Sequence, residues 1–144
     1  MRISTLEELL KEQTFTVHQD GTTKHHRHFQ GYQVTSSEGK TLTLGLNEIS
    51  DGTGQTIFNN FESLLNELAE CIEHKNKREN LEKIVKSIIA TMSDQCATNL
   101  IFNKELQKLK ERVIPHAVEQ WESLNNHEHK EISKVFNFFC KMHI

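Results

Sequence analysis

Apolar and polar residues alternate along three consecutive stretches in the first third of the chain. TFTVH (14–18) and HFQGYQVT (28–35) alternate in this way, and KTLTLGL (40–46) places three leucines on one face. A period of two is typical of half-buried β-strands, and the SSEG sequence between the second and third stretches is typical of a turn. The pattern predicts a three-stranded antiparallel meander over residues 14–46.

After the predicted meander, the apolar period changes to that of a helix. Between residues 56 and 74 the apolar positions recur every three or four residues, which predicts an amphipathic helix. A charged link follows at 75–80. The end of LEKIVKSIIATM is apolar and β-branched with few charges, so a buried fourth strand is expected at 84–92.

Residues 95–144 carry mainly helical patterns. Ser93 or Asp94 can cap a helix that carries spaced leucines, and Pro115 predicts the start of another helix around Val118 and Trp121. The last part of the chain is predicted to be either a helix or a helix that gives way to a strand within VFNFFCKMHI.

These elements together predict a mixed α/β (α+β) fold. Ser4 and Glu7 form a capping-box pattern, so a leading helix is expected within residues 1–13, ahead of one domain at 14–144. A meander followed by crossover units implies a fourth strand parallel to the first, with flanking helices. The apolar run at the end of the chain, from Phe138 onward, predicts an incomplete domain that can self-associate.

The composition excludes several classes of protein. With 35% hydrophobic and 26% charged residues and one proline, the 144 residues predict a single globular domain. The net charge of −3 gives no global attraction to nucleic acid, so any DNA contact would have to be local. The chain has no apolar run typical of a membrane span or a secretory signal, and its three cysteines are widely separated. An intracellular protein with reduced thiols and no membrane partner is expected.

Two aspartates are candidates for a metal site. Asp20 lies at the predicted end of the first strand, in DGTT, and Asp94 lies at the predicted end of the fourth, in TMSDQ. If these strands are adjacent and parallel, both carboxylates emerge at one edge of the sheet, where they can share magnesium or manganese. The alternatives are local, because Asp20 can form a hairpin turn with Gly21 and Asp94 can cap the following helix.

These motifs also resemble a known family. The order of strands, DGTT on the first strand, SDQCATN after the fourth, and the late C-x-x-H of Cys140 and His143 resemble the ribonuclease-H-like catalytic core of DNA transposases, of the hAT type or related transposon-derived proteins. The resemblance covers residues 14–144 and implies a site of three acidic residues. Asp20 and Asp94 match the first two. The third, a glutamate on a late helix, would lie beyond Ile144 in hAT-type proteins.

The resemblance implies a function for intact relatives, which would use magnesium or manganese to cleave DNA phosphodiesters and transfer strands. It also implies a nuclear location. Because no third carboxylate is recognised, this chain is expected to be an inactive fragment of such a domain. Two other hypotheses stay open. The chain could be a non-catalytic interaction or scaffold module, in which the aspartates only turn and cap the chain, or a small zinc-binding domain.

Histidines and cysteines provide the candidate ligands for zinc. His18, His25, His26 and His28 form a dense cluster, and His26 and His28 are expected on one face of a strand. Two histidines in that geometry could bind zinc, although a solvated strand with pH-sensitive charge is the favoured interpretation. Cys140 and His143 could also bind zinc, together with His127 or His129, or Cys140 could be a small core residue. Magnesium or manganese is therefore favoured over zinc.

A run of basic residues near Asp94 is the candidate DNA contact. It consists of Lys104, Lys108, Lys110 and Arg112. Such a run could contact a DNA backbone, or it could be a solvated helix face.

Overall fold

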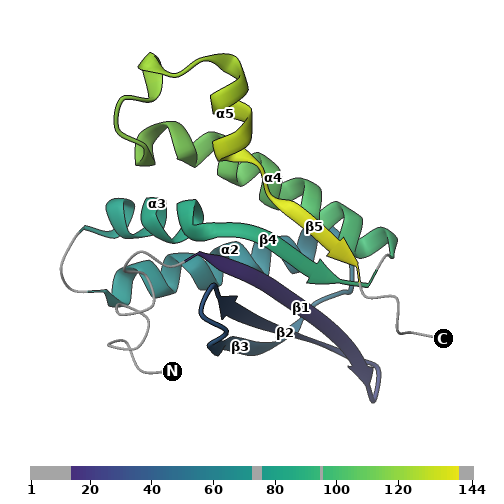
Figure 1. Cartoon of the computed structure of the whole chain (residues 1–144). Coiled ribbons are helices and arrows are strands. Elements are labelled where there is room, and N and C mark those ends of the chain that lie inside the picture. The colour runs from purple at the N-terminus through teal and green to yellow at the C-terminus, as the bar shows by residue number, and fades with distance from the viewer. Residues whose placement is uncertain (1–13, 73–75, 95, 140–144) are drawn as a thin grey trace.

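The computed structural model describes residues 14–72, 76–94 and 96–139, which form one mixed sheet covered by helices on one face (Figure 1). The strands are β1 (Phe15–Lys24), β2 (Arg27–Ser36), β3 (Thr41–Ile49), β4 (Ile88–Ser93) and β5 (Phe136–Phe139). Their order in the five-stranded sheet is β3-β2-β1-β4-β5. The first three strands pair antiparallel, whereas β4 pairs in parallel with β1 and β5 in parallel with β4. The predicted mixed α/β class and the meander are confirmed. The leading helix expected within 1–13 lies outside the described residues.

Three helices pack against the buried face of the sheet. They are α2 (Gly54–Cys71), α3 (Lys77–Ser87) and α4 (Ala97–Ala117). A 3-10 turn, η1 (Trp121–Ser123), and a short helix, α5 (Asn126–Ser133), follow and lie beside the end of α4 (Figure 1). The helical period of 56–74 correctly predicted α2, which Thr53 caps by accepting a hydrogen bond from the Thr56 amide at 3.2 Å.

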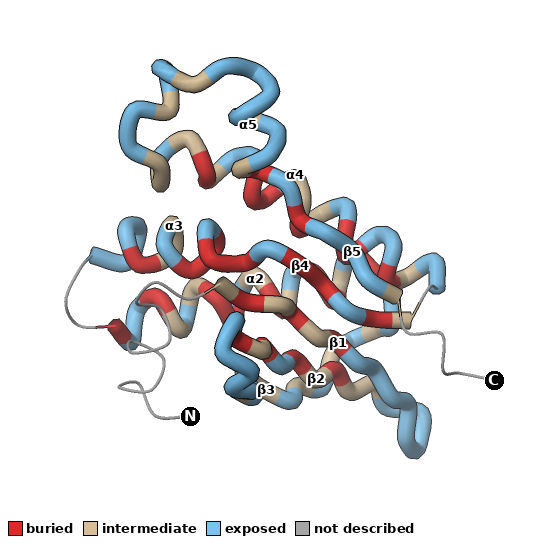
Figure 2. Tube along the Cα trace, viewed as in Figure 1, coloured by how far each residue is buried: buried red, intermediate tan, exposed pale blue. Residues whose placement is uncertain are grey.

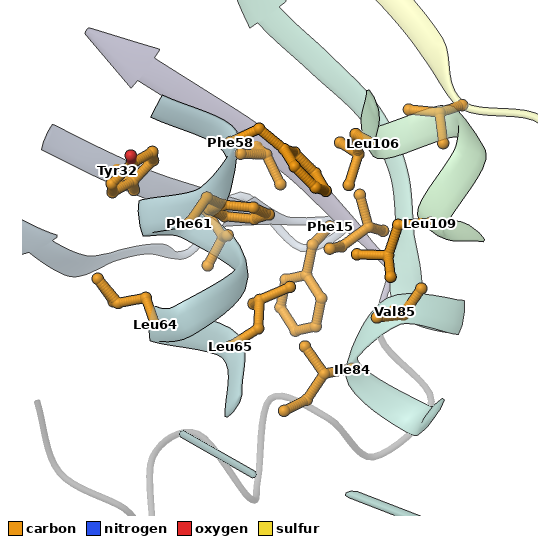
Figure 3. Packing of buried hydrophobic residues seen from close by; sticks show 14 of the residues in the cluster. Phe15, Tyr32, Phe58, Phe61, Leu64, Leu65, Ile84, Val85, Leu106 and Leu109 are labelled. Carbon is orange, nitrogen blue, oxygen red and sulfur yellow. The ribbon is translucent and has the colours of Figure 1, made fainter. Parts of the chain in front are cut away.

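The hydrophobic core lies between the sheet and these helices, as the buried segments in Figure 2 and the side chains in Figure 3 show. Along β1 and β2 every second residue faces this core, which is the alternation that the sequence predicted. An aromatic cluster stands at its centre: the ring centroids of Tyr32 and Phe61 are 5.3 Å apart, and those of Phe61 and Phe102 are 5.4 Å apart. The Tyr32 hydroxyl donates a hydrogen bond to the Ile57 carbonyl at 2.8 Å, so its polar end is satisfied inside the core.

The first strand continues beyond its predicted end at Asp20, to Lys24, and the alternative of a turn at Asp20 and Gly21 is wrong as well. Asp20 pairs with Gly31 and Gly21 with Gln30, so the Asp-Gly dipeptide lies within the hairpin and does not form its turn. The chain reverses instead at His25 and His26, which have φ angles of 52° and 63°. The expectation that His26 shares a strand face with His28 is therefore wrong.

The strand predicted at 84–92 is shorter and follows a helix that the sequence interpretation missed. The charged link at 75–80 begins α3, because the Asn76 side chain accepts a hydrogen bond from the Glu79 amide at 2.9 Å and caps it. Ile84 and Val85 then belong to the buried face of α3, and β4 starts only at Ile88. A short apolar run fits both a buried strand and a buried helix face, which explains the error.

The region after α4 also differs from its prediction. Pro115 lies inside the last turn of α4 and does not start a new helix, and around Trp121 there is only a 3-10 turn. Of the two alternatives for the end of the chain, the helix followed by a strand is correct, with α5 leading into β5.

Candidate functional site

β1 and β4 are adjacent and parallel, as the sequence predicted. The last residues that pair between these strands are His18 and Met92. Asp20 and Asp94 each lie two residues further along, so both continue the face of the sheet to which His18 and Met92 belong. The strand pairing ends before either aspartate, and Asp94 directly follows the last residue of β4.

Both aspartates line the same pocket, which has a volume of about 500 Å³. The first turn of α4 contributes Thr98 and Asn99 to its wall, and the loop before α2 contributes Gly52. The start of a helix carries free N–H groups and the positive end of the helix dipole, which favour an anionic group. The pocket therefore combines carboxylates that suit a cation with a helix terminus that suits a phosphate.

The beginnings of α2 and α4 are in close contact beside this pocket. A Cβ atom placed on the buried Gly54 would lie only 2.6 Å from the Thr98 carbonyl oxygen and 2.6 Å from the Ile101 Cβ. A glycine is thus required for α2 to start this close to α4. This contact fixes the position of α4 against the sheet at the side of Asp94.

A chain of buried amide side chains connects the two aspartate-bearing segments. Gln30 Nε2 donates to Gln19 Oε1 at 2.7 Å, and Gln19 Nε2 donates in turn to Asn99 Oδ1. Asn99 Nδ2 then donates to the Asp94 backbone carbonyl at 2.9 Å. The chain passes from β2 through β1 and α4 to the segment after β4. It therefore holds the backbone of Asp94 in a defined position next to β1.

The two local roles that competed with metal binding are not the ones observed. Asp20 forms no turn, because it pairs with Gly31 in the middle of the hairpin. Asp94 does not cap α4 either, since the N-cap position belongs to Cys96, which makes no side-chain capping bond. The alternatives of a turn at Asp20 and a helix cap at Asp94 are therefore both wrong, and both residues line the pocket.

The chemistry of the pair suits a hard divalent cation. Magnesium is typically held by one or two carboxylates, and its remaining coordination positions are filled by waters and substrate phosphates. Among the described residues, no group of three His, Cys, Asp or Glu side chains could hold a metal ion. The two aspartates therefore provide a minimal donor set, to which a ligand would have to contribute oxygens.

The histidines are distributed over different parts of this region. His18 and His28 line the pocket, whereas His25 and His26 form the hairpin turn. His28 Nδ1 lies 3.2 Å from the Thr23 hydroxyl oxygen. Hydrogen bonds from Thr53 lower the pKa of the Asp51 carboxyl, with a smaller contribution from His28. The dense sequence cluster is thus split between the pocket and the turn.

The other candidate zinc ligands fall in a separate part of the fold. Cys140 and His143 lie outside the described residues. His129 stacks on Trp121 with ring centroids 3.9 Å apart, and its Nε2 donates to the Trp121 carbonyl at 2.7 Å. One ring nitrogen of His129 is thus already engaged in packing η1 against α5.

The basic run on α4 is not a continuous DNA-binding face. Lys110 is buried and donates a hydrogen bond to the Ile88 carbonyl at 2.6 Å, and burial lowers its pKa to about 8. Lys108 pairs with Glu105 at 3.4 Å and Arg112 with Glu62 at 3.6 Å. Only Lys104 remains as an exposed cation of that run with no partner among the described residues.

The sequence interpretation did not single out Gln19, Gln30 or Asn99. A signal was present, because Gln19 is in phase with Phe15 and Val17 on the buried face of β1. A polar residue at a position where the alternation requires an apolar one indicates either a buried polar network or a functional contact.

The chain matches no protein-family model, and neither a curated protein nor a solved structure is significantly similar to it. None of the helices in the described residues is long and apolar enough to span a bilayer.

Proposed function

We propose that this chain is a ribonuclease-H-like domain of the transposon-derived kind, in which Asp20 and Asp94 bind magnesium or manganese together with a nucleic-acid phosphate. The observation that carries the proposal is the parallel pairing of β1 with β4, together with the presence of both aspartates in the lining of one pocket. The antiparallel meander followed by two parallel strands also supports this reading.

The residues of the pocket would have distinct tasks. The carboxylates of Asp20 and Asp94 would hold the cation, and the first turn of α4 would attract the phosphate. The bound ion would neutralise charge on the phosphate and lower the pKa of a coordinated water. The amide chain from Gln30 to Asn99 would keep the Asp94 backbone in place while the ligand binds.

Catalysis needs more than this pair. The family resemblance implies a third carboxylate, and no third acidic side chain joins Asp20 and Asp94 within residues 14–72, 76–94 and 96–139. With two carboxylates, the metal affinity should be weak without a ligand and stronger with a phosphodiester that supplies further oxygens. The proposed activity is therefore metal-dependent binding of nucleic acid in the nucleus, without strand cleavage by this chain.

A direct test is a manganese titration followed by electron paramagnetic resonance, with and without a short DNA duplex. Asp20→Asn and Asp94→Asn should each weaken manganese binding at least tenfold. Glu38→Gln is the matched control, because Glu38 is exposed in the turn between β2 and β3 and does not line the pocket. Equal affinities in all four proteins would refute the metal site.

Cys96 offers a second readout for the same pocket. Its thiol is exposed and lines the pocket, whereas the exposed Cys71 at the end of α2 does not. DNA and manganese together should slow alkylation of Cys96 while Cys71 reacts at its usual rate, as followed by peptide mass spectrometry. If both thiols respond alike, the ligand does not occupy the pocket.

The alternative, a non-catalytic interaction module, is favoured by one observation. On the face of the sheet opposite the helices, Met92 pairs with Phe138, and Ala90 pairs with Phe136. The exposed fractions of Met92, Phe136 and Phe138 are 41%, 46% and 52%. Such an apolar surface suits self-association. Analytical ultracentrifugation of wild type and Phe138→Ser tests it, and a monomeric wild type at all concentrations would exclude it.

A further inference from the structure

The tip of the hairpin between β1 and β2 has an unusual sequence for its conformation. Lys24 and Arg27 form the last pair of the two strands, and His25 and His26 are the two residues between them. Both histidines have positive φ angles, 52° and 63°, as in a type I′ turn. Asn-Gly is strongly preferred at these positions, because side chains with a Cβ atom are strained there. The turn is thus built from residues that reduce its stability.

The same four residues all carry basic side chains. Arg27 is neutralised by Glu48 on β3, to which its guanidinium donates two hydrogen bonds, one of them at 2.7 Å. Lys24, His25 and His26 are exposed and have no ion pair or side-chain hydrogen bond among the described residues. On the neighbouring strand, Glu48 is already paired with Arg27. The tip therefore presents the Lys24 ammonium group and two exposed imidazole rings, each of which offers a ring N–H donor.

The hairpin also projects next to the candidate site. In Figures 1 and 2 it extends beyond the helices as an exposed loop. Thr22, Thr23 and His28, which lie just below the tip, line the same pocket as Asp20 and Asp94. At about 3.3 Å per residue, the tip is about 13 Å from Asp20 along β1, which equals about four base steps of a duplex. A nucleic acid with a phosphate at the aspartates would pass the tip.

We propose that Lys24, His25 and His26 form a contact for the phosphodiester backbone of a nucleic acid that extends out of the pocket. This inference rests on the proposed function for the identity of the ligand. Lys24 supplies a positive charge, and the two imidazole rings supply N–H donors for phosphate oxygens. Because the chain has a net charge of −3, binding of a polyanion requires a local positive charge such as that of Lys24.

The decisive variant replaces both turn residues, His25→Asn with His26→Gly. Asn-Gly suits the turn, so the melting temperature should rise, which excludes unfolding as the cause of any loss of binding. Affinity for a short DNA duplex should fall about tenfold, because both imidazole rings are removed from the contact.

Two further variants complete the test. Lys24→Gln should reduce the slope of log K against log salt by about 1, because one phosphate contact is lost. His127→Asn is the control, because His127 is exposed on α5 and distant in sequence from the hairpin, and its affinity for DNA should match that of wild type. Single-stranded DNA and RNA serve as separate arms, which identify the kind of nucleic acid. Equal competition by anionic lipid vesicles would overturn the assignment to nucleic acid.

The result separates this inference from the proposed function. If the Asn-Gly variant keeps the wild-type affinity for DNA while Asp20→Asn abolishes manganese binding, the hairpin contact is refuted and the metal site stands. If the Asn-Gly variant binds DNA about tenfold more weakly while manganese has no effect in any protein, the hairpin contact stands and the metal site is refuted. A wild-type protein that binds no nucleic acid refutes both.

Discussion

Gln19 on β1 donates a buried hydrogen bond to Asn99 in the first turn of α4, and Asn99 in turn donates a hydrogen bond to the Asp94 carbonyl. This bond joins the strand that carries Asp20 to the helix that follows Asp94. Gln19 is 6% exposed and Asn99 9% exposed, so neither amide can exchange its partner for bulk water at low cost. The geometry of the candidate metal pair therefore depends on residues that would not touch the metal.

The first prediction concerns this connection. Gln19→Leu leaves Gln30 Nε2 and Asn99 Oδ1 without their hydrogen bonds to Gln19, so the free energy of unfolding should fall by about 1–3 kcal/mol. Because Asn99 is then connected to Asp94 but no longer to β1, manganese affinity should fall as well, at a temperature where the variant is still folded. Chemical denaturation and manganese titration measure the two effects. Gln33→Leu, at an exposed position on β2, is the control and should change neither.

Gln19→Glu separates the positioning of Asp94 for manganese binding from the stability of the fold. Glutamate can still accept the hydrogen bond from Gln30 but, when ionised, cannot donate to Asn99. If Gln19→Leu loses stability but both variants bind manganese as wild type does, the amide chain is only part of the core.

The second prediction tests the close approach of α2 and α4. Gly54→Ala places a Cβ atom 2.6 Å from the Thr98 carbonyl oxygen, and a backbone oxygen cannot move away as a flexible side chain can. The variant should lose about 1–3 kcal/mol of unfolding free energy, although alanine is a better helix former than glycine. Gly31→Ala is the control, since its Cβ would be 3.6 Å from the Leu46 Cδ1, an ordinary contact. Equal stabilities of the two variants would contradict the contact.

The third prediction concerns Lys110. Burial lowers its pKa to about 8 from 10.5, so between these values the unfolded chain holds a proton that the folded chain has released. The free energy of unfolding should therefore rise with pH above about 8, by at most about 3 kcal/mol in total. Lys110→Met should remove this rise, whereas Lys104→Met, on the exposed side of the same helix, should retain it.

The effect of Lys110 on the unfolding free energy has to be measured below about pH 9.5. Burial also raises the pKa of the Tyr32 hydroxyl, so above about pH 10 the unfolded chain loses a proton that the folded chain retains. That effect lowers stability as the pH rises and would mask the contribution of Lys110. A wild-type unfolding free energy that does not change between pH 7.5 and pH 9.5 would contradict the prediction.

The sequence predicted those parts of the fold in which the apolar period is unambiguous. Alternation in β1, β2 and β3 and the long helical period of α2 each specify one element, and the resulting order is compatible with β4 lying parallel to β1, as observed. The expectation that Asp20 and Asp94 share one edge of the sheet came from that topology. It did not follow from their local sequences, which suggested a turn and a cap and were misleading in both cases.

The errors have a common physical origin in tertiary packing. Asp-Gly is a strong turn signal, yet Asp20 and Gly21 stay extended because they pair with Gly31 and Gln30 in a long hairpin. The boundary between α3 and β4 falls inside one apolar run, where both elements are buried against the same core. The burial of Lys110 is also invisible in a lysine-rich helix, since only packing against β4 decides which lysine faces inward.

The fourth prediction concerns Asn103 on the buried face of α4. Its side chain is 3% exposed, and neither its Oδ1 nor its Nδ2 has a hydrogen-bond partner among the described residues. A buried amide without partners costs about 1–3 kcal/mol, and leucine has a similar size without polar atoms. Asn103→Leu should therefore raise the unfolding free energy by about 1 kcal/mol or more, as measured by chemical denaturation. Asn66→Leu is the control and should be neutral or destabilising, because the Asn66 side chain donates to the Glu62 carbonyl at 2.9 Å. A loss of stability in Asn103→Leu would indicate that this amide has a partner in the folded protein.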